Sequence, residues 1–103
     1  MKMAIYYLTC KDNGEVDEIS NALLEKKLVA CAKKFPVESR FWWQGNIDNA
    51  NEVVVMYESM EENFEKINTE VKKLSSYETY ILFSIPVSKT TKEVESWLKE
   101  ELK

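Results

Sequence analysis

The sequence predicts an α+β domain in which two β-α-β halves form one open sheet. Three observations carry this prediction: short apolar runs typical of strands, two stretches with apolar side chains at helical spacing, and the similar length of the two halves. A chain of 103 residues has the usual length of one domain. We therefore expect residues 1–103 to fold as a single domain around one core.

The first half of the chain predicts a strand, a helix and a second strand. Met3–Cys10 is a short apolar run that leads into turn-forming residues, as a buried strand does. A helix should follow, capped by Asp12 or Asn13. Its apolar stripe comprises Val16, Ile19, Leu23, Leu24 and Leu28. After Val29 the period changes to two, which predicts a strand with one covered face. The residues on that face are Phe35, Val37, Phe41 and Trp43.

The second half predicts a strand, a helix, a strand and a final helix. Residues 44–46 form a tight-turn signal, the polar residues 48–51 follow, and Val53–Tyr57 is a continuous apolar strand of the kind found at the centre of a sheet. The next helix carries one apolar stripe, made by Met60, Phe64, Ile67, Val71 and Leu74. Tyr80–Val87 predicts the last strand. The final helix should be capped by Thr90 or Thr91, and its apolar residues are Val94, Trp97, Leu98 and Leu102.

The order β-α-β-β-α-β-α predicts the ferredoxin-like split βαβ fold, with sheet order 4-1-3-2 and both helices of the repeat on one face. Strands 1 and 2 are then separated by strand 3, so Cys10 and Cys31 should lie about 10 Å apart and form no disulfide. The other face of the sheet would expose large apolar side chains, because the apolar runs in strands 1, 3 and 4 are nearly continuous. Self-association into a symmetric oligomer is the expected solution.

Charge and hydropathy exclude some classes of partner. The chain has 14 basic and 18 acidic side chains, so we expect no nucleic acid partner, which would require a basic surface. No apolar stretch approaches the roughly 20 residues that span a bilayer, so we expect no membrane insertion. The N-terminal residues lack the apolar region of a signal peptide, which predicts a cytoplasmic protein.

The candidate chemistry is limited because the chain has no histidine, the usual transition-metal ligand and acid–base group at neutral pH. No nucleophile has a histidine partner, and two glycines cannot form a phosphate-binding loop, so we do not expect an enzyme. One acidic cluster could bind a hard cation or could be a solvated helix start, and its spacing does not match an EF-hand. It comprises Asp12, Glu15, Asp17 and Glu18.

Sulfur supplies the remaining metal-binding candidates. Cysteine and methionine are soft ligands that suit Cu(I). Cys31 can be read as a copper ligand or as a small buried hydrophobe. Cys10 has charged neighbours and should be the more exposed thiol, whereas Met56 and Met60 are expected in the core. One of the adjacent Trp42 and Trp43 should pack in the core and the other against a neighbouring subunit.

Five segments together resemble a known family over nearly the whole chain. Residues 42–47 (WWQGNI) are the most specific, because they match a WWxGxI hairpin at the expected place in the topology. The others are residues 6–9 (YYLT), residues 23–32 (LLEKKLVACA), residues 77–78 (YE) and residues 97–98 (WL). In combination they are similar to the CutA-type divalent-cation tolerance proteins.

The resemblance implies a ferredoxin-like homotrimer in which strands pair between subunits, with a role in tolerance of divalent metals, above all copper. It places Cys31 at the family's most regular cysteine, as the metal-ligand candidate. It places Trp42 and Trp97 in the trimer interface. The residues implied for an intersubunit cleft are Trp43, Glu58, Tyr77 and Glu78.

The sequence departs from the family pattern at the cleft. Ser75 and Ser76 replace a usual His-Pro pair, and Tyr80 replaces a proline. Glu58 stands for a usual lysine and Lys33 for a usual asparagine. The leading hypothesis is a trimeric protein of metal tolerance that acts by binding or signalling. The alternative is a trimeric scaffold or regulator that binds a protein or small molecule in the cleft, without a metal role.

Overall fold

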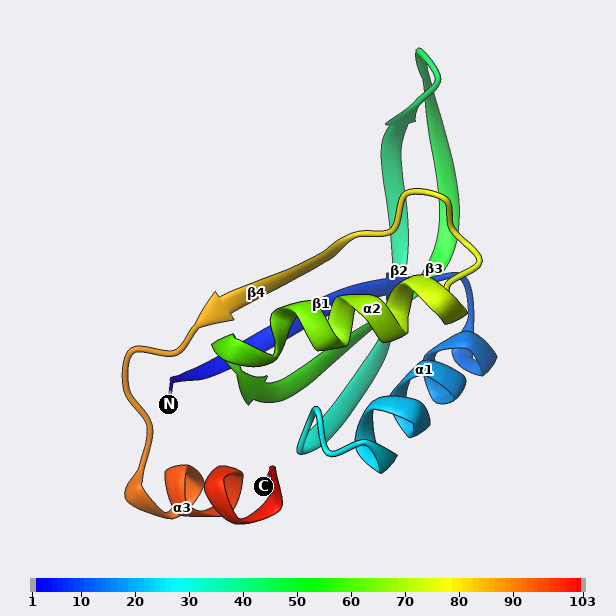
Figure 1. Cartoon of the computed structure of the whole chain (residues 1–103). Helices are drawn as coiled ribbons and strands as arrows, with labels where there is room; N and C mark the ends of the chain where they lie inside the picture. Colours follow the sequence, from blue (N-terminus) through cyan, green and yellow to red (C-terminus); the bar gives the residue numbers. More distant parts are fainter. Residues whose placement is uncertain (1, 103) are drawn as a thin grey trace.

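The computed structural model describes residues 2–102 and contains a four-stranded antiparallel sheet (Figure 1). Its strands are β1 (Met3–Cys10), β2 (Cys31–Trp43), β3 (Asn46–Met60) and β4 (Leu82–Pro86). They lie in the order β2-β3-β1-β4, with antiparallel pairing throughout. This is the predicted order 4-1-3-2 read from the opposite edge, so the ferredoxin-like α+β fold is confirmed.

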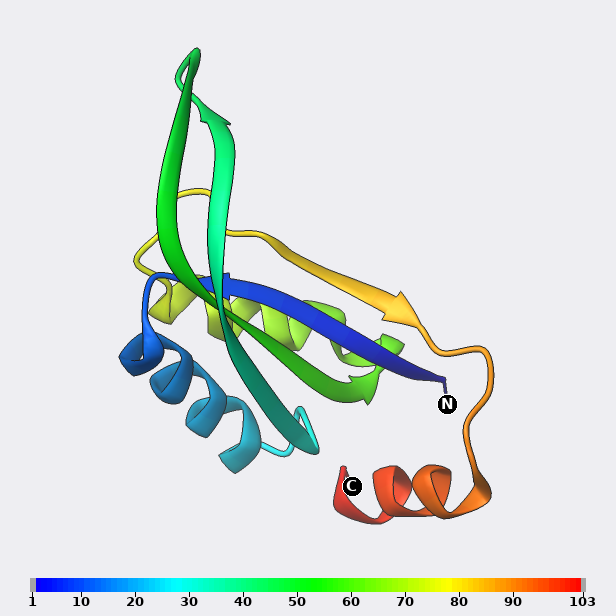
Figure 2. The same cartoon turned by 180° about the vertical axis from the view of Figure 1, so that it is seen from behind.

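Two helices, α1 (Asn13–Glu25) and α2 (Phe64–Leu74), cover one face of the sheet (Figures 1 and 2). Asp12 is the N-cap of α1, since its Oδ1 accepts a hydrogen bond from the Glu15 backbone N–H at 2.9 Å. A short 3-10 turn, η1 (Glu61–Asn63), precedes α2. The third helix, α3 (Lys92–Glu101), is capped by Thr91, one of the two predicted alternatives.

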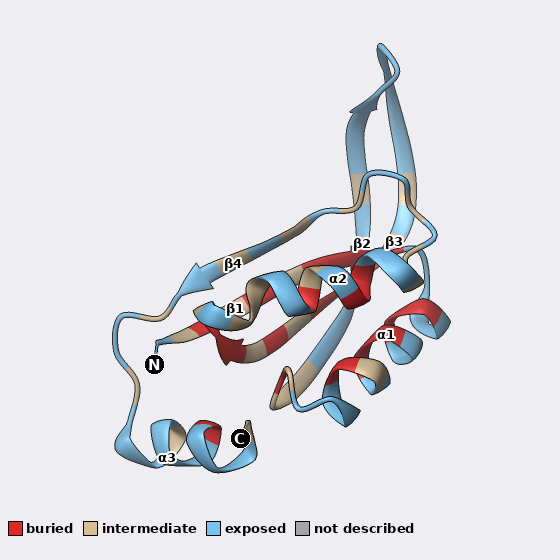
Figure 3. Ribbon diagram, viewed as in Figure 1, coloured by how far each residue is buried: buried red, intermediate tan, exposed pale blue. Residues whose placement is uncertain are grey.

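The core lies between the sheet and these two helices, where the buried residues are drawn in red in Figure 3. Tyr6 and Tyr57 are fully buried, and each phenol has a partner. The Tyr6 hydroxyl donates to the Met60 carbonyl oxygen at 2.7 Å, and the Tyr57 hydroxyl lies 2.8 Å from Ser20 Oγ on α1. The sheet and helix faces are thus joined by apolar packing and by a buried polar contact.

Several predicted boundaries are wrong. The polar residues 48–51 lie inside β3, because they pair with β2 in a continuous ladder. Met60 ends β3 and does not belong to α2, although it is buried as predicted. Leu28 lies beyond α1, where Lys27 turns the chain with a φ of +57°, and it still packs against the core. Pairing with a neighbouring strand thus overrides the local polar pattern.

The outer parts of β2 and β3, residues 37–52, form a hairpin arm that projects beyond the helices (Figure 1). Gln44 and Gly45 form its tight turn with φ values of +50° and +84°, which confirms the predicted turn. Trp42 is 72% exposed and Trp43 is 43% exposed. The expectation that one tryptophan packs in the core is therefore wrong, because the core ends before the arm begins.

The face of the sheet opposite α1 and α2, called the open face below, is strongly apolar. In the register, Ile5 lies beside Ile85, and Tyr7 lies beside Phe83 with the ring centroids 4.6 Å apart. Four of its large side chains stay exposed: Phe35 (42%), Ile81 (56%), Phe83 (41%) and Ile85 (45%). The prediction that one face of the sheet exposes large apolar side chains is confirmed. The prediction that one face of the second strand is covered is wrong for the single chain, because that face belongs to the open face.

Candidate functional site

Cys31 begins β2 at the edge of the sheet, and Glu58 of β3 is its partner in the register. Lys33, two residues further along the same face, makes an ion pair with the Glu58 carboxylate. Its Nζ also lies 3.4 Å from Cys31 Sγ. The hydrogen bond to Glu58 raises the pKa of Lys33 above its ordinary value, so the ammonium stays charged beside the thiol. We call these three residues the Cys31 cluster.

The Cys31 cluster explains two of the sequence departures together. A carboxylate at position 58 and an ammonium at position 33 compensate each other across two neighbouring strands. The cluster offers a cation one soft sulfur and one carboxylate that is already paired with Lys33. Within residues 2–102, no group of three or more His, Cys, Asp or Glu side chains is placed to hold a metal ion.

Tyr77 and Glu78 lie in residues 75–80, which form all but the last residue of the loop that joins α2 to β4. The Tyr77 hydroxyl donates to Glu52 Oε2 on β3 at 2.6 Å. Burial and the neighbouring Glu52 carboxylate raise the pKa of Tyr77, so it remains a neutral donor. Glu78 is exposed, and this loop and α2 line a shallow hollow. Its lining residues are Asn68, Lys72, Tyr77, Glu78, Thr79 and Tyr80.

Sequence reasoning missed Glu15 as a structural residue. The sequence suggests a solvated acidic cluster, yet Glu15 is only 6% exposed, and its two carboxylate oxygens accept hydrogen bonds from two backbone N–H groups. Oε1 accepts from Lys11 at 3.0 Å and Oε2 accepts from Ser76 at 2.8 Å. The sequence did contain a signal for this role, because Glu15 lies three residues after the Asp12 cap. An acidic side chain at that position often turns back toward backbone N–H groups at the start of the helix.

The remaining predicted site residues lie far apart within one chain. Trp43 ends β2 and Cys31 begins it, so about 40 Å of extended strand separates them. Trp42 lies at the tip of the hairpin arm, and Trp97 of α3 is 39% exposed. The structure therefore brings Cys31 and Glu58 together and keeps Tyr77 beside Glu78. It does not join these pairs to the tryptophans.

Cys10 differs from the expectation that it is the more exposed thiol. It is 1% exposed at the end of β1, whereas Cys31 is half-buried, and both are free. Burial raises the pKa of Cys10 to about 12, with the Glu15, Asp12 and Glu52 carboxylates adding to the effect. Cys10 is thus a neutral thiol within the core at neutral pH.

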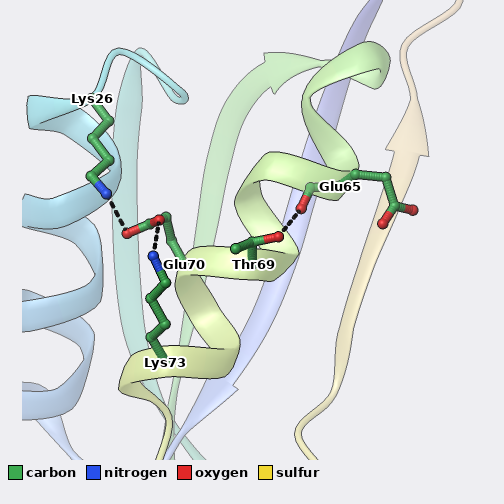
Figure 4. A network of polar contacts seen from close by, with 5 residues as sticks. All are labelled: Lys26, Glu65, Thr69, Glu70 and Lys73. Carbon is green, nitrogen blue, oxygen red and sulfur yellow. Dashed lines mark hydrogen bonds and ion pairs between the residues drawn. The ribbon is translucent and has the colours of Figure 1, made fainter.

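The two helices behind the sheet are tied by an ion-pair network (Figure 4). The Glu70 carboxylate on α2 accepts from Lys26 Nζ, just after α1, at 2.8 Å and from Lys73 Nζ at 3.1 Å. Lys26 is the main cause and Lys73 the second cause that lower the pKa of Glu70. This network connects the end of α1 to α2. Separately, the Thr69 hydroxyl donates to the Glu65 carbonyl oxygen within α2 at 2.9 Å.

None of the helices described between residues 2 and 102 combines the length and apolar character needed to cross a membrane.

Comparison with known proteins assigns the chain to a family. Residues 4–101 match the profile of the family described as CutA1 divalent ion tolerance protein. The divalent-cation tolerance protein CutA of Archaeoglobus fulgidus is 38% identical over 94 residues, which cover 91% of this chain and 92% of the relative. The protein of the same name from Thermotoga maritima is 33% identical over 100 residues, which cover 97% of this chain and 99% of the relative.

Solved structures agree with the sequence relatives. The structure of the periplasmic divalent cation tolerance protein CutA from Archaeoglobus fulgidus superposes with a TM-score of 0.96 at 36% identity and covers 98% of this chain and 99% of its own. A mutant form of CutA1 from Pyrococcus horikoshii gives a TM-score of 0.93 at 28% identity, with coverage of 97% of this chain and 98% of its own.

The periplasmic description of the Archaeoglobus fulgidus protein contradicts the cytoplasmic location predicted from the sequence, and that prediction is wrong. It rested on the lack of a leader-like apolar region, and the composition of a folded domain does not reveal its compartment. The family itself follows from the matched profile and from relatives that cover the chain almost completely. This chain belongs to the CutA1 divalent ion tolerance family.

Proposed function

We propose that this chain acts in divalent-metal tolerance as a homotrimer that binds or signals metal, with copper as the metal, rather than as a catalyst. Residues 1–103 would form one domain in each copy. The observation that carries the proposal is the open face, whose exposed apolar side chains require a partner surface. Family membership supports the role in tolerance of divalent cations.

Two unlike apolar surfaces support a ring of copies over a two-fold dimer. The open face carries Phe83 and Ile85, and the hairpin arm carries exposed Trp42 and Trp43. When the arm of one copy covers the open face of the next, the interface joins two different surfaces, and such interfaces form a ring when the rotation between copies closes. The edge strand β2 also leaves one side of its backbone unpaired within the chain, which favours strand pairing between copies. In this assembly Trp42 and Trp97 would lie in the interface.

The cleft of the proposed trimer would be lined by residues that lie apart in one chain, namely Trp43, Glu58, Tyr77 and Glu78. In the trimer, metal binding would use the Cys31 thiols of more than one copy, because Cu(I) prefers two or more soft ligands and Cys31 is the partly exposed thiol of each chain.

Titration with Cu(I) under reducing conditions, against a competing chelator, tests this proposal. We expect Cys31→Ala to lose at least about tenfold in affinity, since one of few soft ligands is removed. Cys10→Ala is the matched control, because Cys10 is a buried core thiol and its loss should leave copper affinity unchanged. Equal affinity of the parent protein and Cys31→Ala would contradict the role of Cys31.

One observation favours the alternative function. The Lys33 ammonium lies 3.4 Å from Cys31 Sγ, so a cation that approaches this sulfur meets a positive charge that only the Glu58 carboxylate compensates. A trimeric scaffold or regulator that binds a small molecule or a protein in the cleft would use this charge directly. Absence of Cu(I) binding by the intact trimer would favour this function over the metal-binding one.

A further inference from the structure

We propose that Glu15 and Glu52 form a two-carboxylate clamp that holds the loop of residues 75–80 against the body of the protein, and that protonation of Glu15 loosens the clamp and releases this loop while the sheet stays folded. Two consecutive loop residues are held. The Ser76 backbone N–H donates to Glu15 Oε2 at 2.8 Å, and the Tyr77 hydroxyl donates to Glu52 Oε2 at 2.6 Å.

The two carboxylates belong to different elements, which makes the clamp a tertiary connection. Glu15 lies in the first turn of α1 and Glu52 lies on β3, so the loop is fastened to a helix and to the sheet at once. Figures 1 and 2 both show the loop after α2 passing beside the base of the hairpin arm. The other hydrogen bonds found for residues 75–80 stay local, whereas the carbonyl oxygen of Ile81, next to β4, accepts from the Thr9 N–H of β1 at 3.2 Å. Ser75 N–H donates to Val71 O at 2.8 Å, and the Tyr80 hydroxyl donates to Asn68 Oδ1 at 2.5 Å, both on α2.

The electrostatics make Glu15 the acid-sensitive half of the clamp. Burial alone would raise its pKa, but hydrogen bonds from Ser76 and Lys11 and the Lys11 charge hold it below the ordinary value of 4.5. The charged and titratable groups around it are Lys11 and Asp12 at the helix start, Cys10 on β1, and Tyr77 in the loop. Cys10 and Tyr77 are neutral at physiological pH, so Lys11 is the neighbouring cation.

The sign of the pH dependence follows from the lowered pKa. A carboxyl group with a lowered pKa in the folded state stabilises that state above its ordinary value, and the contribution disappears as pH falls through the folded pKa. The clamp should therefore be closed at neutral pH and should open progressively below about pH 4.5. Protonated Glu15 keeps only one good acceptor for two backbone donors, so its contacts with Lys11 and Ser76 cannot both keep their full strength.

Release of the loop would dismantle the hollow beside α2. Four of the six residues that line it come from the loop: Tyr77, Glu78, Thr79 and Tyr80. Loops held by few contacts can open at a small fraction of the free energy of global unfolding. The clamp would thus control whether this hollow exists, independently of whether the protein binds metal.

Amide hydrogen exchange of the intact assembled protein, followed at residues 75–80, tests the clamp. We expect Glu15→Gln and Glu52→Gln each to speed exchange in the loop by about tenfold at pH 7, the effect of losing one charge-assisted hydrogen bond. Exchange in β1 and β3 should stay within about twofold of the parent protein. Glu18→Gln is the control, since Glu18 is an exposed acid on the same helix and should change nothing.

A pH series on the parent protein completes the test and does not depend on the variants folding. After correction for the intrinsic pH dependence of exchange, the loop should become less protected below pH 4.5 while the strands remain protected. Tyr77→Phe removes only the Glu52 contact and should reproduce the Glu52→Gln result. Loop protection that is unchanged in both Gln variants, or lost only together with that of the strands, would overturn the proposal.

Discussion

Individual residues show which contacts local sequence can reveal. The Asp12 cap is predictable because the capping residue and its partner, Glu15, lie three residues apart. The contact of Glu15 with Ser76 is not predictable in this way, because Ser76 lies 61 residues further along the chain. The same reasoning applies to Cys10, whose burial depends on residues brought together only by the fold.

The buried contact between Tyr57 and Ser20 gives a prediction at this scale. Tyr57→Phe should lower the free energy of unfolding by about 1–2 kcal/mol, because it leaves the buried Ser20 hydroxyl without a partner. Ser20→Ala should cost a similar amount, and the double variant should cost less than the sum. Urea denaturation of all four proteins at one concentration measures the coupling. Strictly additive losses would show that the contact contributes nothing.

The predicted bounds of helices and strands agree well with the structure where the apolar side chains are periodic in the sequence. Residues 3–10 are predicted as a strand, and β1 has these bounds because its alternate side chains face the core. Residues 48–51 of the hairpin arm fall outside the predicted strand because they are polar, and the backbone pairing that holds them in β3 leaves no periodic signal in polar side chains.

The turn of the hairpin arm gives a prediction at the scale of one element. Gly45 has a φ of +84°, a left-handed value that costs other residues about 1–2 kcal/mol. Gly45→Ala should therefore lower the free energy of unfolding by about 1 kcal/mol, whereas Gly45→Asn should cost less because asparagine tolerates this region. Denaturant midpoints at equal protein concentration provide the comparison. An alanine variant as stable as the parent would contradict the assignment of turn strain.

At the scale of the whole molecule, the sequence predicts the structure least completely. The fold and the bare face are predictable, because apolar strands without a second helix layer imply exposure on one side. The cleft is not, because its residues come together only if copies of the chain assemble. Trp43 and Tyr77, for example, lie on separate parts of one chain, and the residues near each of them in the sequence do not predict which residues they contact.

Substitution on the open face should separate folding from assembly. Ile85 is 45% exposed on this face, so Ile85→Ser should weaken self-association by about tenfold or more and leave the circular dichroism spectrum of the fold unchanged. Leu24→Ser is a matched control, since Leu24 is 38% exposed on α1, away from the open face. Sedimentation velocity over a concentration series compares the two. Equal weakening by both variants would argue against a specific role for the open face.

The central claim is that three copies of this chain cover one another's open faces. Size-exclusion chromatography with light scattering, at micromolar concentration, tests it most directly. The account predicts a mass three times that of the 12.1 kDa chain. A mass equal to one chain at that concentration would contradict it.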